Sequence, residues 1–252
     1  MPHYRTTFLK QVILRLDYGR LPALQVEQET PFTADMRARY PEVNSNQAQQ
    51  FALMMAPGGL SHQQVTSAGW VRVHRAQGTA RSVTLAPEFV AIEYGEKSYQ
   101  HFEELEEQFS FVLDSFRRHF RVTQFTRIGL RYVNEITLAE GSALEWDGLI
   151  SPNLVISIKA GLFGTLRMHR SLHQLTASKD DMSVVLTYGI NNPDFPGPVA
   201  RRQFILDLDC YISEVIASVE AEQRIKDLNG LAEYIFESSI ENGLREKMEV
   251  IQ

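Results

Sequence analysis

Two segments of the chain alternate apolar and polar side chains, which is the period of a β-strand with one buried face. They are residues 127–136 (RIGLRYVNEI) and residues 204–212 (FILDLDCYI). Side chains two positions apart share a face of a strand. Arg127 and Arg131 are therefore on one face of the first segment, and Asp207 and Asp209 are on one face of the second. Opposite charges within one sheet favour pairing between these residues.

Other short runs predict further strands of an antiparallel sheet. They are residues 8–17, 70–74, 82–85, 89–94, 154–158, 166–175 and 183–190. Pro87 and Glu88 separate two of these runs and predict the turn of a hairpin. Residues 30–67 contain several prolines and glycines and a run rich in glutamine and asparagine, so a short helix or a flexible loop is expected there.

Two longer segments have apolar residues at the three- and four-residue spacing of an amphipathic helix. The first begins with Ser98 as its N-cap and ends near Phe120, and the second covers residues 227–248. In the first helix, glutamates occupy the first turns while Arg117 and Arg118 occupy the last, which complements the helix dipole. Helix stabilisation is therefore favoured over anion binding as the role of these two arginines.

Together these elements predict an α+β fold, in which antiparallel sheet is covered by two long amphipathic helices. The length of 252 residues and the hydrophobic content of 44% suit a single domain. A strand pair followed by a helix occurs at residues 81–120 and again at residues 182–248. This recurrence favours two similar lobes within the domain, residues 1–138 and 150–252.

Charge and cysteine content restrict the partners and the compartment. A net charge of −6 and a pI of about 5.7 disfavour a nucleic-acid partner held over the whole surface. Cys210 is the only cysteine, and its place in an apolar strand predicts a core residue in a reducing cytoplasm. The first ten residues lack the apolar run of a signal peptide, and no apolar run is long enough to span a membrane. No membrane partner is expected.

Asp207 and Asp209 are the strongest candidates for a chemical site. Two carboxylates about 7 Å apart on one face of a strand are able to share a divalent cation such as Mg²⁺, which prefers oxygen ligands. Two carboxylates are too few for a complete site, and the competing interpretation is that they pair with Arg127 and Arg131. No other cofactor is expected, and no residue set is complete enough to be called catalytic.

Two weaker candidates lie close together in the chain. His169 and His173 are four residues apart, which suits metal ligands on a helix, but their surroundings predict a strand and two ordinary polar histidines. The turn at residues 161–164 (GLFG), followed by Arg167, is a candidate anion site.

The order of three motifs suggests a relationship. The segments RIGLRYVNEI and LDLDCYI, followed by LAEYIFESSIENGLREKM, resemble a sporadically distributed family of uncharacterised bacterial and archaeal proteins of similar length. The resemblance spans nearly the whole chain and implies a small prokaryotic cytoplasmic protein. It implies no reaction and no catalytic residues.

The clear patterns are architectural, so the leading hypothesis is a non-enzymatic protein that binds a protein partner or a second copy of itself. The first alternative is a divalent-metal-dependent enzyme acting on nucleotides or nucleic acid, in which Asp207 and Asp209 hold the metal while Arg127 and Arg131 clamp phosphate. The second alternative is binding of an RNA or DNA phosphate backbone through a local basic patch that also includes Arg117 and Arg118.

Overall fold

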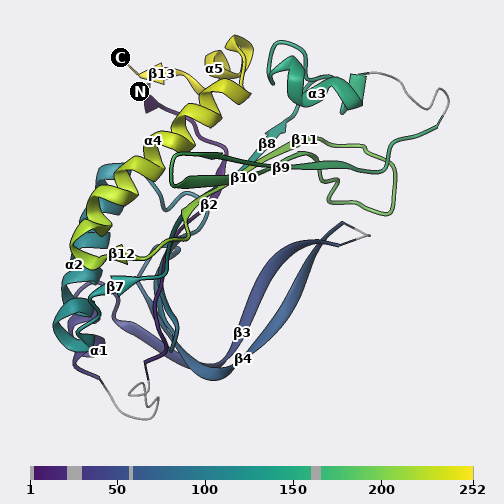
Figure 1. The fold of residues 1–252 in the computed structure, drawn as a ribbon. Coiled ribbons are helices and arrows are strands. Elements are labelled where there is room, and N and C mark those ends of the chain that lie inside the picture. Colours follow the sequence, from purple (N-terminus) through teal and green to yellow (C-terminus); the bar gives the residue numbers. More distant parts are fainter. Residues whose placement is uncertain (1–2, 22–29, 57–58, 160–165, 252) are drawn as a thin grey trace.

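The computed structural model describes residues 3–21, 30–56, 59–159 and 166–251. Its centre is a sheet of nine antiparallel strands (Figure 1). In spatial order these are β3 (Glu42–Ala56), β4 (Gly59–Arg75), β5 (Arg81–Leu85), β6 (Phe89–Tyr94), β2 (Leu9–Asp17), β8 (Arg127–Leu138), β11 (Arg202–Ile212), β10 (Met182–Ile190) and β9 (Ser171–Lys179). Two small pairs are β1 (His3–Tyr4) with β13 (Val250–Ile251), and β7 (Gln124–Phe125) with β12 (Ile216–Ala217).

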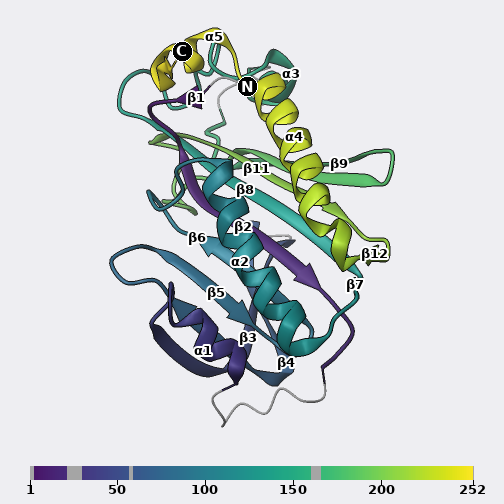
Figure 2. The ribbon, with the colours of Figure 1, turned by 90° about the vertical axis from the view of Figure 1, so that its left-hand side faces the viewer.

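Two long helices, α2 (Phe102–Phe120) and α4 (Ala221–Ser239), lie on the same face of this sheet (Figure 2). The apolar stripe of α2 is buried against the strands, with Phe109 and Phe116 near its middle. Each such side chain contributes about 2 kcal/mol by leaving water. The predicted fold class is confirmed: the protein is α+β, with an antiparallel sheet under two long amphipathic helices.

The remaining helices are short. They are α1 (Pro31–Met36), α3 (Pro152–Lys159), α5 (Asn242–Met248) and a 3₁₀ turn (Ser218–Glu220).

Residues 1–138 supply six strands of the large sheet and residues 150–252 supply three, and the two sets meet where β8 pairs with β11. None of the helices in the described ranges is both long and apolar enough to cross a membrane.

Three local predictions between residues 98 and 175 are wrong. Residues 154–158 belong to α3 and not to a strand, and the helix begins at Pro152, whose fixed φ suits a first helical turn. The strand expected at residues 166–175 begins only at Ser171. The N-cap of α2 is His101, whose ring nitrogen accepts a hydrogen bond from the backbone of Glu104, and Ser98 lies before the helix.

Two larger segments also differ from the prediction. The described residues between 30 and 67 form α1, β3 and the first half of β4, which pairs with β3, so the short helix expected there is confirmed and the flexible loop is wrong for the strands. The helix expected at residues 227–248 is divided into α4 and α5. It breaks at Ile240, which is extended, buried and bridged to Ile150. Ile240 is buried in a core cluster that contains Trp146 and Phe204, and this burial explains the break.

Candidate functional site

The charged residues of β8 and β11 that the sequence singles out lie on the face of the sheet opposite the helices. Arg131 donates two hydrogen bonds to Asp207, from Nε to Oδ1 at 2.8 Å and from Nη2 to Oδ2 at 2.6 Å. Nη2 of Arg127 is 3.1 Å from both carboxylate oxygens of Asp209. The predicted pairing between β8 and β11 is therefore confirmed, and guanidinium groups occupy the carboxylate oxygens that a metal would need.

Local packing explains why these pairs form. The guanidinium group of Arg127 lies over Gly129, where the Cβ atom of any other residue would collide with it. The absence of a side chain at Gly129 therefore lets Arg127 reach Asp209. Asp207 is only 5% exposed, so its negative charge requires a partner. Burial acts to lower the pKa of Arg131, but the hydrogen bonds and charge of Asp207 outweigh it and raise that pKa. Arg131 therefore stays charged and keeps the pair intact.

The described surroundings of Asp207 and Asp209 do not complete a metal site. Within the parts of the chain that the structure describes, no three or more histidine, cysteine, aspartate or glutamate side chains are grouped so that they could hold a metal ion. Glu135, on the same strand as Arg131, lies 3.6 Å from Lys10. The open face of the sheet is thus a set of ion pairs across neighbouring strands.

The four arginines proposed for phosphate binding are divided between the two sides of the sheet. Arg127 and Arg131 lie on the open face, whereas Arg117 and Arg118 lie near the C-terminal end of α2 on the other side. Arg118 is 3.3 Å from a carboxylate oxygen of Asp35, and Arg117 donates to the backbone oxygen of Ser218. The structure therefore does not bring them into a single basic patch.

The cysteine and the two histidines have ordinary surroundings. Cys210 is fully buried, and burial together with the charge of Asp209 raises the pKa of its thiol to about 12. His173 is held by Ser157 and Ser171, while His169 contacts the backbone oxygen of Pro196. Neither histidine joins a larger ligand set among the residues that the structure describes, and the candidate anion turn at residues 161–164 lies outside them.

The helix-bearing face is not covered along its full width. In Figure 2, β9 extends beyond α4, and the short helix α3 lies only at the upper end of this side, where Ser157 contacts His173 of β9. Between α4 and the β9–β10 hairpin lies a groove of about 730 Å³. We call it the α4 groove, and its apolar lining comes from Leu175, Met182, Val184, Leu186, Leu231 and Ile235.

Three features of the α4 groove distinguish it from an ordinary surface. Leu175 of β9 is 52% exposed, and Tyr234 of α4 is 67% exposed. Gly230 also lines the groove, and a Cβ atom placed there would meet no other atom within 4 Å. A glycine inside a helix costs about 1 kcal/mol relative to alanine, and no contact among the described residues requires it. The free space allows another backbone to approach α4 closely.

Sequence reasoning missed the α4 groove because two elements far apart in the chain form it. A signal was nevertheless present: Gly230 interrupts the helical pattern, and Tyr234 is an aromatic residue outside the apolar stripe of α4. No protein-family model and no curated protein matches the chain. A functional proposal for this protein therefore rests on the geometry of the structure.

Proposed function

We propose that the protein is a non-enzymatic, cytoplasmic interaction module that works as a homodimer, with the α4 groove as its docking surface. The observation that carries this proposal is the apolar groove next to the open space at Gly230. A partner helix lying beside α4 would cover the exposed side chain of Leu175 on β9. A second copy of α4 is the occupant that we propose, because Gly230 would then meet Gly230 across a twofold axis.

This arrangement uses the exposed side chains of both copies. Helices normally pack 8–10 Å apart, and glycine at the crossing point permits a closer approach. The Tyr234 side chain of each copy would then contact the apolar lining of the other α4 groove. A buried aromatic anchor within an apolar patch is the usual source of binding energy at protein interfaces.

The two alternatives have less structural support. The metal-dependent enzyme requires Asp207 and Asp209 to release the guanidinium groups that already hold their oxygens. The phosphate-binding alternative requires a basic patch, yet three of its four arginines pair with carboxylates of other elements. The resemblance to the sporadically distributed prokaryotic family is compatible with an interaction module, because that resemblance carries no reaction.

Sedimentation equilibrium of the wild type and of Gly230→Leu tests the proposal. We expect a wild-type dimer and a monomeric variant, because the leucine side chain would fill the space where the second helix approaches. The substitution suits an exposed helical position and improves helix propensity, so the variant monomer is expected to remain folded. Glu246→Leu, at an exposed position on α5, is the matched control and is expected to remain dimeric. A wild type that is monomeric at every concentration would refute the proposal.

A further inference from the structure

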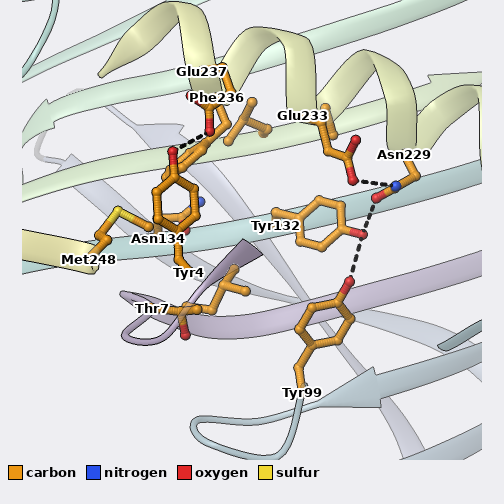
Figure 3. Close-up of a pocket in the computed structure, with 13 residues that line it drawn as sticks. Tyr4, Thr7, Tyr99, Tyr132, Asn134, Asn229, Glu233, Phe236, Glu237 and Met248 are labelled. Atoms are coloured by element: carbon orange, nitrogen blue, oxygen red, sulfur yellow. Dashed lines mark hydrogen bonds between the residues drawn. The ribbon is translucent and has the colours of Figure 1, made fainter. Parts of the chain in front are cut away.

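A second cavity lies on the sheet side of α4, apart from the α4 groove. It has a volume of about 150 Å³ and is bordered by α4, the N-terminal segment and strand β8 (Figure 3). Its polar lining residues are Tyr4, Thr7, Tyr99, Tyr132, Asn134, Asn229, Glu233 and Glu237. We call it the tyrosine pocket. Thr7, which is exposed, stands at its rim, so the pocket is open to solvent along the N-terminal segment.

A directed chain of hydrogen bonds runs along one wall of the pocket. The hydroxyl of Tyr132 donates to Oδ1 of Asn229 at 2.7 Å, and Nδ2 of Asn229 donates to Oε1 of Glu233 at 2.8 Å. Because Tyr132 has only one hydroxyl proton, Tyr99 must be the donor in the 3.2 Å contact between the two hydroxyls. Every donor therefore points toward Glu233, whose carboxylate is the end of the chain (Figure 3).

The second carboxylate in the pocket is already neutralised. Glu237 accepts a hydrogen bond from Tyr4 at 2.7 Å, and its other oxygen is 3.0 Å from Nε of Arg245. Glu233, by contrast, forms no ion pair with any residue in the described ranges, and the pocket lining contains no lysine, arginine or histidine. One negative charge in the pocket thus lacks a positive partner.

The rest of the lining is aromatic or aliphatic. Tyr99 and Tyr132 meet edge to face with their ring centroids 5.9 Å apart. Burial raises the pKa of Tyr99 to about 12, so its phenol is neutral at physiological pH. Aromatic faces attract cations. The apolar remainder, Leu9, Leu208, Phe236 and Met248, suits a short hydrocarbon chain.

We propose that the tyrosine pocket binds a small primary alkylamine in its protonated form, with the ammonium group at Glu233 and the alkyl chain against Phe236 and Met248. Liquid water occupies about 30 Å³ per molecule, so the cavity holds a ligand of about five heavy atoms. An ammonium group supplies donors to a carboxylate whose other neighbours include neutral phenols. A bare divalent metal ion fits less well, because it needs about six oxygen ligands and the lining offers an apolar wall.

Calorimetric titration with n-butylammonium chloride, compared with 1-butanol, tests this site. The two probes have the same length and differ in charge. We expect saturable binding of the amine and at least tenfold weaker binding of the alcohol. If the alcohol binds as tightly as the amine, the pocket is only an apolar cavity and the proposal fails.

Glu233→Gln and Glu246→Gln are a matched pair, because each removes one negative charge from a helix but only Glu233 lines the pocket. The first is expected to weaken amine binding at least tenfold and the second to leave it unchanged. Equal affinities for the wild type and Glu233→Gln would overturn the assignment. Glutamine can still accept the hydrogen bond from Asn229, so folding is expected to be kept, and an unchanged thermal transition checks this. Gly230→Leu is expected to leave amine binding intact, which separates this site from the α4 groove.

Discussion

Arg131 holds Asp207 by two parallel hydrogen bonds, Nε to Oδ1 at 2.8 Å and Nη2 to Oδ2 at 2.6 Å, across strands β8 and β11. Fork geometry of this kind is stronger and more directional than a single contact. Because Asp207 is nearly inaccessible to solvent, the pair lies partly inside the protein, where the loss of one partner leaves the other charge uncompensated. The pair is therefore a structural connection between the two halves of the sheet.

Asp207→Asn is expected to lower the free energy of unfolding by about 2 kcal/mol, because Arg131 then keeps its charge without a charged partner. Asp209→Asn is expected to cost less than about 1 kcal/mol, because Asp209 is more exposed and water screens its charge. Urea denaturation of both variants measures the difference. Addition of Mg²⁺ is expected to leave the wild-type midpoint unchanged, and a midpoint raised by Mg²⁺ in the wild type but not in Asp207→Asn would restore the metal-site hypothesis.

The buried ring of His74 is expected to make the free energy of unfolding depend on pH. The ring is fully buried against Phe32, neither ring nitrogen has a partner among the described residues, and burial with the charges of Arg72 and Arg37 lowers its pKa to about 4. The unfolded chain, with an ordinary histidine pKa of about 6.5, binds the proton more readily. The stabilising effect of a neutral His74 is therefore complete above pH 6.5 and is lost as the pH falls toward 4.

Between pH 7 and pH 5 this group alone is expected to remove about 2 kcal/mol of stability. Urea denaturation of the wild type and of His74→Leu at several pH values isolates its contribution, because the other titrating groups are common to both proteins. The difference in unfolding free energy should shift in favour of the variant as the pH falls. Parallel pH profiles would show that His74 is able to take up a proton in the folded protein.

Cys210 is expected to be unreactive toward a thiol reagent in the folded protein. Its side chain is fully buried in β11, and its raised pKa leaves almost no thiolate at neutral pH. With an aromatic disulfide as the reagent, the absorbance of the thiolate that it releases measures the reaction. In denaturant, labelling of Cys210 should become rapid and reach one label per chain. Fast labelling under native conditions would mean that the centre of the sheet opens readily.

Leu175→Lys tests the groove from the strand side. A lysine on β9 would place a charge in the proposed apolar contact, so the dissociation constant of the dimer is expected to rise at least tenfold. Ile156→Lys is a suitable control, because Ile156 is similarly exposed on α3 and lies outside the groove lining. Sedimentation velocity distinguishes the two variants, and equal dissociation constants for Leu175→Lys and the control would argue against the α4 groove.

The best-predicted parts of the fold are the strands and the helix whose spacing of apolar residues identifies the buried face of the element. Strict alternation identified β8 and β11, and with them the pairing of Arg127 and Arg131 with Asp209 and Asp207. The buried stripe of α2 was predictable for the same reason, because helical spacing and burial agree along its whole length.

The local pattern does not show which residues are buried by contacts from distant parts of the chain. In β4 the structure buries Arg72 and His74, because α1 supplies Thr33 as an acceptor and Phe32 as a ring contact on that side. The sequence around residues 70–74 does not predict that α1 packs against this strand. The same holds for Ile240, whose pairing with Ile150 divides the C-terminal helix.

Oxidative crosslinking of Gly230→Cys tests the proposed dimer most directly. If two copies of α4 cross at this position, the two new cysteines lie within the Cα separation of about 6 Å that a disulfide requires. Cys210 is buried and gives no background. We predict a covalent dimer for Gly230→Cys and little or none for the exposed control Glu246→Cys. Failure of Gly230→Cys to crosslink, or equal crosslinking of the control, would contradict a docking surface at the α4 groove.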